Sequence, residues 1–184
     1  HSPPDMTLLR PLMTYLKEGA PRSAAEQLKA LRASAPEKAP VLAEMIVMLE
    51  VIDARLATWQ GHVRERRASA ALELFEEMSE VEGRLVSMVL SPAPPPSPLL
   101  REMRAKTAQL FLSLGREEKG RGRPDLAFAH VDQGYRLEPG NADLASLLVQ
   151  LEREAAARLA REQTCESFRF VTSTTRSDTT LHAR

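Results

Sequence analysis

The chain has 184 residues and carries 25 basic and 25 acidic side chains, so its formal net charge is zero. A neutral chain lacks the broad positive field that non-specific nucleic-acid binding requires. The single cysteine, Cys165, excludes an intramolecular disulfide and a zinc site built from several cysteines. Aromatic residues make up only 4% of the chain, and Ala, Leu, Met, Glu and Arg favour helices, so we expect an all-α fold.

The first ninety residues predict four helices, because apolar residues recur there at intervals of three and four. They cover Asp5–Lys17, a stretch from Ser23 to Pro36, Val41–Gln60 and Arg66–Leu90, with Asp5 and Ser23 as N-caps. The third is apolar on most sides and is expected to be the central buried element. The fourth is expected to bury Leu72, Phe75, Met78, Leu85 and Val89 and to expose Glu73, Glu76, Glu77, Glu80 and Glu82.

Residues 91–98 read Ser-Pro-Ala-Pro-Pro-Pro-Ser-Pro, a composition that excludes a helix and favours an extended polyproline conformation. We interpret this segment as a stiff spacer between an N-terminal helical half, residues 1–90, and a C-terminal helical half, residues 99–163. The spacings Pro92–Pro95 and Pro95–Pro98 also suit an SH3-like groove, which is the alternative.

Three further helices are predicted after the spacer, over residues 99–118, 126–137 and 142–162. A Gly- and Arg-containing loop separates the first two, and the turn Pro139-Gly140-Asn141 separates the last two. The tail, residues 164–184, is rich in Thr and Ser around Phe168, Phe170 and Val171. This composition favours a short extended tail that forms a strand or a hairpin.

The C-terminal half contains a pattern that resembles the tetratricopeptide repeat (TPR), a family of helix pairs of about 34 residues. The pattern runs over Ala108–Asn141, and the phrase Gly134-Tyr-Arg-Leu-Glu-Pro-Gly-Asn141 is its strongest part. Glu118 departs from the pattern, because a Tyr usually stands there. The matching residues are Phe111, Leu114, Gly115, Ala127, Val131, Gly134 and Pro139.

The same register fits residues Asp5–Lys38, with Pro11-Leu12 in place of the usual Leu-Gly pair. The middle, Ala39–Leu90, does not fit. The resemblance therefore implies an antiparallel arrangement of helix hairpins, with a generic helical bundle as the alternative. The matching N-terminal residues are Leu8, Leu12, Tyr15, Ala24, Leu28, Leu31 and Pro36.

The resemblance implies that the first helix of each pair lines a groove for a partner. In the C-terminal pair the lining residues are Gln109, Leu112, Arg116 and Lys119. Arg116 and Lys119 lie one turn apart and suit a carboxylate or phosphate; the alternative is two solvated charges at a helix end.

In the N-terminal pair the implied lining residues are Met6, Leu9, Met13 and Leu16. This Met-rich strip suits an amphipathic helix of a partner. The alternative is that later helices cover the strip as part of the core.

The histidines His62, His130 and His182 show no metal-ligand spacing, and the acidic helix lacks the Glu-x-x-His pairs of di-metal bundles. The loop Arg116–Arg123 carries four cations and two glycines but lacks the Gly-Lys-Ser/Thr of a P-loop, so we interpret it as a solvated connector. We expect no enzyme, no cofactor and no metal.

The sequence therefore predicts a non-enzymatic adaptor or scaffold domain that binds a peptide or amphipathic helix of another protein. The alternative is a regulatory or assembly domain that forms homo-oligomers through its tail. A nucleic-acid module is a third interpretation, and it would use Arg64, Arg66, Arg67, Arg121 and Arg123. No apolar run reaches membrane-spanning length, and a cytoplasmic location is expected.

Overall fold

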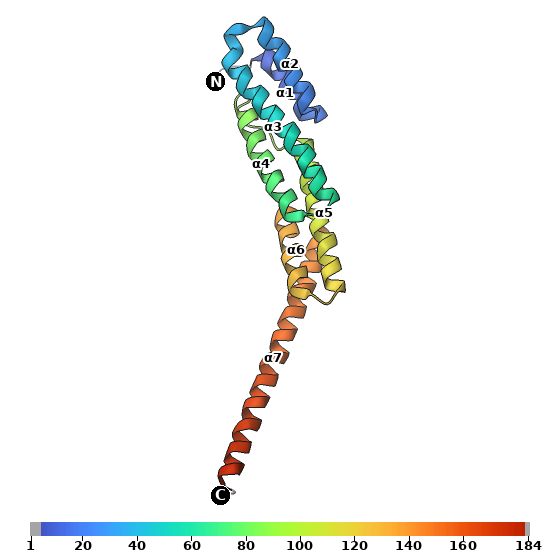
Figure 1. Cartoon of the computed structure of the whole chain (residues 1–184), viewed down its shortest axis with the longest axis vertical. Helices are drawn as coiled ribbons and strands as arrows, with labels where there is room; N and C mark the ends of the chain where they lie inside the picture. The colour runs from blue at the N-terminus through green and yellow to red at the C-terminus, as the bar shows by residue number, and fades with distance from the viewer. Residues whose placement is uncertain (1–4, 183–184) are drawn as a thin grey trace. The chain divides into compact units, whose positions relative to one another are not determined.

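The computed structural model describes the backbone of residues 5–182 and the side chains of residues 5–169. Over this range it is all-helical, as predicted, and it contains no strand (Figure 1). The chain divides into two compact units, residues 1–111 and 112–184. The elements are α1 (Met6–Glu18), α2 (Pro21–Ser34), the 3₁₀ turn η1 (Pro36–Lys38), α3 (Ala39–Arg64), α4 (Ala68–Ser87), α5 (Pro98–Gly120), α6 (Pro124–Leu137) and α7 (Ala142–His182).

Local sequence signals define the ends of α1. The Asp5 side chain accepts a hydrogen bond from the backbone N–H of Thr7, and Gly19 ends the helix at a φ of 64°. A left-handed φ favours glycine, which has no Cβ to clash. Helix α2 begins differently from the prediction, because Pro21 occupies its first turn and no side chain caps it. Ser23 therefore lies inside the helix and is not its cap, since the fixed φ of proline already suits a first helical position.

Helix α3 packs against both α2 and α4, which confirms its predicted central place. It is not buried on every side, because the Val47 side chain is 59% exposed. The indole N–H of Trp59 donates to the Thr107 hydroxyl on α5 over 3.0 Å, so this buried aromatic residue has a satisfied polar end. The buried face of α3 consists of Leu42, Met45, Ile46, Leu49, Ile52 and Trp59.

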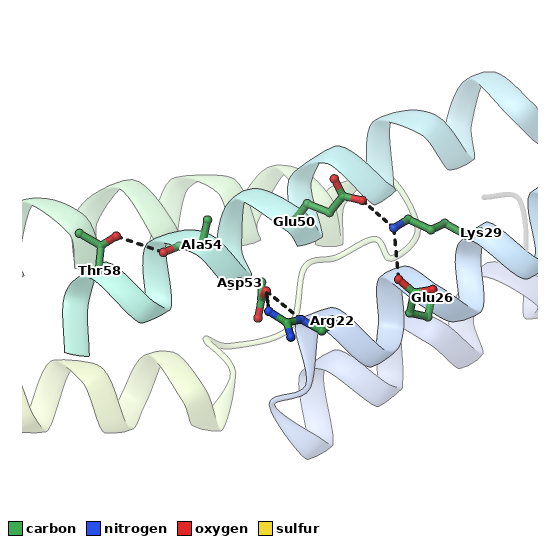
Figure 2. Close-up of polar contacts among 7 residues, drawn as sticks. All are labelled: Arg22, Glu26, Lys29, Glu50, Asp53, Ala54 and Thr58. Carbon is green, nitrogen blue, oxygen red and sulfur yellow. Dashed lines mark hydrogen bonds and ion pairs between the residues drawn. The ribbon is translucent and has the colours of Figure 1, made fainter. Parts of the chain in front are cut away.

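Ion pairs along the solvent side of α2 and α3 join the two helices (Figure 2). Arg22 Nη2 lies 3.1 Å from Asp53 Oδ2, and Lys29 Nζ lies 3.0 Å from Glu50 Oε1. Hydrogen bonds to Glu50 and then to Glu26 raise the pKa of Lys29. Because these pairs are solvent-exposed, each contributes little to the stability of the fold.

Helix α4 buries Phe75, Met78 and Leu85, as its spacing predicts. It also buries Glu82, which is only 4% exposed. The prediction that Glu82 belongs to a solvated acidic face is therefore wrong. Its Oε1 atom accepts hydrogen bonds from the Tyr15 hydroxyl and the Ser97 hydroxyl, each at 2.5 Å. Its Oε2 atom accepts from the backbone N–H of Ser97 at 3.1 Å. Three donors thus satisfy a carboxylate that would otherwise be costly to bury.

The Tyr15–Glu82–Ser97 network connects α1, α4 and the residue that precedes α5. Burial and the nearby Glu82 carboxylate raise the pKa of the Tyr15 phenol, so the phenol keeps its proton. The Ser97 hydroxyl also accepts from the backbone N–H of Leu100 and so caps the first turn of α5. The network therefore joins three segments of the first unit through buried side chains.

The proline-rich segment is non-helical over residues 91–97, as predicted, and Pro98 begins α5. It lies inside the first unit, between α4 and α5. The boundary between the two units falls at Phe111 and Leu112, within α5. The predicted division of the chain at the spacer therefore differs from the division that the packing produces.

In the second unit α5 and α6 approach each other closely at Gly115. A Cβ atom at this position would lie 2.4 Å from Val131 Cγ2 and 3.4 Å from the carbonyl oxygen of Ala127. Both Ala127 and Val131 are fully buried. The absence of a side chain at Gly115 and the small side chain of Ala127 therefore permit the close packing of this hairpin. Helix α6 also packs against α7. The Asn141 side chain caps α7, because it accepts a hydrogen bond from the backbone N–H of Leu144 over 3.1 Å.

The predicted extended tail is not observed, because α7 continues to His182. The sequence offers a physical reason: no Gly or Pro follows Gly140, and a run of good helix formers surrounds Ala155–Ala157. Extending an existing helix costs far less than nucleating a new element. The side chains of Phe170 and Val171 lie outside the described residues.

Candidate functional site

An open groove lies between α1 and α2 and is lined by eight residues. Its apolar lining includes Met6, which is 69% exposed, and Pro11 and Leu31 from the two facing helices. Pro11 has no N–H, so the carbonyl oxygen of Thr7 lacks its usual helical donor. The groove combines an apolar surface with polar edges, as surfaces that bind helices or peptides do. The full lining is Met6, Thr7, Arg10, Pro11, Gln27, Ala30, Leu31 and Ser34.

Of the apolar strip expected in the N-terminal pair, only Met6 lines this groove. Leu9 and Met13 are half-buried and do not line the groove, and Leu16 is buried in the core. The groove instead uses the edge of α1 that faces α2, so it includes Thr7, Arg10 and four residues of α2 that the family pattern did not suggest. The spacing of residues 6, 7, 10 and 11 places them on one side of a helix, but only the position of α2 shows that this side forms a groove.

Polar contacts join α1 to its two neighbours, α2 and the η1 turn. Gln27 Nε2 on α2 donates to the Thr14 hydroxyl on α1 over 3.2 Å. Near the start of α1, Lys38 Nζ lies 2.9 Å from Asp5 Oδ2 and donates to the Thr7 hydroxyl over 2.6 Å. Hydrogen bonds from Thr7 and Lys38 lower the pKa of the Asp5 carboxyl from 3.8 to about 2. Asp5 therefore couples the cap of α1 to the η1 turn.

Acid should weaken this coupling. Because the folded-state pKa of Asp5 is about 2 and its ordinary value is 3.8, the stabilisation is complete above pH 3.8 and is lost as the pH falls towards 2. We expect Asp5→Asn to lower the urea midpoint at pH 6, and the difference from wild type to shrink below pH 4. Denaturation curves from pH 2 to pH 7 measure it, with Glu37→Gln, an exposed neighbour, as the control. A difference that does not depend on pH would contradict the assignment.

The site predicted in the C-terminal pair is only partly on the surface. Leu112 is fully buried and belongs to the core, so it is not accessible to a partner. Gln109 and Arg116 are exposed, and Lys119 is half-buried. Arg116 Nη2 lies 3.8 Å from Asp143 Oδ2, and Lys119 Nζ lies 4.0 Å from Glu154 Oε1. Carboxylates of α7 therefore already face the two cations that were expected to bind a ligand.

The cations of the loop between α5 and α6 also face a carboxylate within the chain. Glu118, whose side chain is only 13% exposed, forms ion pairs with Arg121 at 3.1 Å and Arg123 at 3.5 Å. The residue that departs from the family pattern thus organises the loop that follows it. Another arginine of the nucleic-acid interpretation, Arg67, forms an ion pair with Glu65. These contacts reduce the positive charge that either a phosphate or a nucleic acid would meet.

Among the described residues, no group of three or more His, Cys, Asp or Glu side chains lies close enough to hold a metal ion. Cys165 is exposed on α7. Over the same part of the chain, no helix combines the length and the apolar character that crossing a bilayer requires.

Comparisons with known proteins identify no relative: no family model, no curated protein and no solved structure matches this chain. The function must therefore be argued from the geometry of the chain itself.

Proposed function

We propose that this chain is a helical interaction domain, an adaptor or scaffold that binds a peptide or an amphipathic helix of another protein. The observation that carries the proposal is the open groove between α1 and α2. A groove between two helices accepts a helix when apolar side chains line it and polar groups border it. Met6 supports this proposal, because a methionine that is 69% exposed offers an adaptable apolar contact.

We further propose that the helix pairs are repeat-like in the TPR sense. The close packing of α5 on α6 at Gly115 supports this arrangement. The packing of α1 on α2 and of α2 on α3 is also consistent with successive hairpins. In such folds partners bind to surfaces formed by consecutive helices, and the α1–α2 groove is a surface of that kind.

The test is a selection of displayed 16-residue peptides on the intact protein, followed by affinity measurements on the selected peptides. We expect Met6→Ser/Leu31→Ser to weaken binding at least tenfold, because each side chain loses an apolar contact. Val47→Ser is the matched control, since Val47 is also exposed but lies on α3 outside the groove. Equal loss in both variants, or no selected peptide, would refute the proposal.

A second candidate function is assembly through α7. Its support is that Glu152–Arg169 contains no buried residue, and that Leu159 and Phe168 are 56% and 72% exposed. Nine helical positions separate these two residues, so they point to opposite sides and form no continuous stripe. Assembly would therefore need two different contacts on α7. The molar mass, measured over a range of protein concentrations, distinguishes peptide binding from assembly. A protein that stays monomeric and binds peptides fits only the interaction domain.

A further inference from the structure

The charges of the α1–α2 groove are unbalanced. Arg10 is the only charged residue among the eight that line it. The Arg10 side chain is exposed, and it has no ion pair within the side chains that the structure describes. An unpaired guanidinium beside apolar side chains differs from Arg116 and Lys119, which face carboxylates of α7.

The other polar groups of the groove already have partners. Thr7 donates to Asp5 and accepts from Lys38, Gln27 bonds Thr14, and Ser34 donates to the carbonyl oxygen of Leu31. Nearby carboxylates are also engaged, because Asp5 pairs with Lys38 and Glu26 pairs with Lys29. Arg10 is therefore the charged group of this groove, and it has no ion-pair partner among the described side chains.

We propose that the occupant of the groove is an acidic amphipathic helix of a partner protein. Its apolar residues, spaced three and four apart, contact Met6 and Leu31, and a Glu or Asp side chain pairs with Arg10. The planar guanidinium binds a carboxylate through two parallel hydrogen bonds, and the adjacent apolar surface shields the pair from water. This inference rests on the proposed function and adds the charge of the ligand.

The experiment is a charge exchange in the peptide selection. Peptides selected on the wild type should carry Glu or Asp next to apolar residues, and a selected peptide should lose about tenfold in affinity when that Glu becomes Gln. The variant Arg10→Glu should instead select Lys or Arg at the same position. Arg32→Glu is the control: Arg32 is an exposed cation of α2 outside the groove lining, and this variant should still select acidic peptides.

The methyl resonance of Met6 locates the bound peptide, with the buried Met45 and Met103 as internal references. A shift of the Met6 signal alone supports binding in the groove. Peptides that shift Met6 but show no acidic preference would refute the inference and leave the proposed function standing. No bound peptide would refute both. A Met6 signal that changes with protein concentration alone would identify a second copy as the occupant and refute the acidic partner.

Discussion

Replacing Glu82 with alanine is expected to lower the free energy of unfolding by about 3 kcal/mol. The substitution removes the acceptor of three hydrogen bonds, from the Tyr15 hydroxyl, the Ser97 hydroxyl and the Ser97 backbone N–H. Each buried donor without a partner costs about 1–3 kcal/mol, and relief from burying a carboxylate offsets part of the sum. Urea denaturation at neutral pH measures the change.

The matched control for this variant is Glu76→Ala, which removes an exposed carboxylate from the same helix and should change stability by less than about 0.5 kcal/mol. Glu82→Gln should fall between the two, because an amide keeps one oxygen acceptor but presents an NH₂ group where the carboxylate has its second oxygen. If Glu82→Ala and Glu76→Ala were equally stable, the network would contribute nothing.

The second large effect is expected at Gly115. An added Cβ would lie 2.4 Å from Val131 Cγ2, so α5 and α6 must separate or Val131 must move. Overpacking of this kind costs about 1–3 kcal/mol, whereas alanine in place of glycine inside a helix stabilises by about 1 kcal/mol. We therefore expect Gly115→Ala to destabilise the protein by up to about 2 kcal/mol on balance, measured by thermal or urea unfolding.

Gly83→Ala provides the control, because nothing lies within 4 Å of a Cβ atom at that position of α4. This variant should be stabilised by up to about 1 kcal/mol, opposite in sign to Gly115→Ala. A double-mutant cycle with Val131→Ala should then show a favourable coupling between the two positions. If the two glycine variants were stabilised alike, the close approach would be wrong.

Local patterns predicted most of the helices. Asp5, Gly19 and the turn Pro139-Gly140-Asn141 act on backbone groups within a few residues, so their effect is visible in the sequence. Gly115 also belongs to the repeat pattern that the sequence shows, and in the fold it lies where α5 and α6 approach closely. The prediction of an extended tail was wrong. Thr favours strands on average, but the uninterrupted helix that precedes the tail decides its conformation.

The candidate site was harder to predict, because it depends on contacts between distant residues. Glu82 looks like its acidic neighbours on α4, and it is distinguished by its partners Tyr15, which is 67 positions away, and Ser97, which is 15 positions away. The lining position assigned to Leu112 faces the core, and the partners of Arg116 and Lys119 come from a different helix. Arg10 carries no motif. Arg10 stands out because no acidic residue lines the groove, and only the fold shows which residues line it.

The position of the boundary between the two units decides how the chain can be dissected. The boundary separates Phe111 from Leu112, two adjacent core residues of α5 that are 1% and 0% exposed. A cut in the proline-rich segment would remove Trp59's hydrogen-bond partner, Thr107, from the first unit. A cut after Gly120 would leave the second unit without Gly115. A cut at either loop therefore takes residues of α5 away from one of the two units, because the boundary lies within this helix.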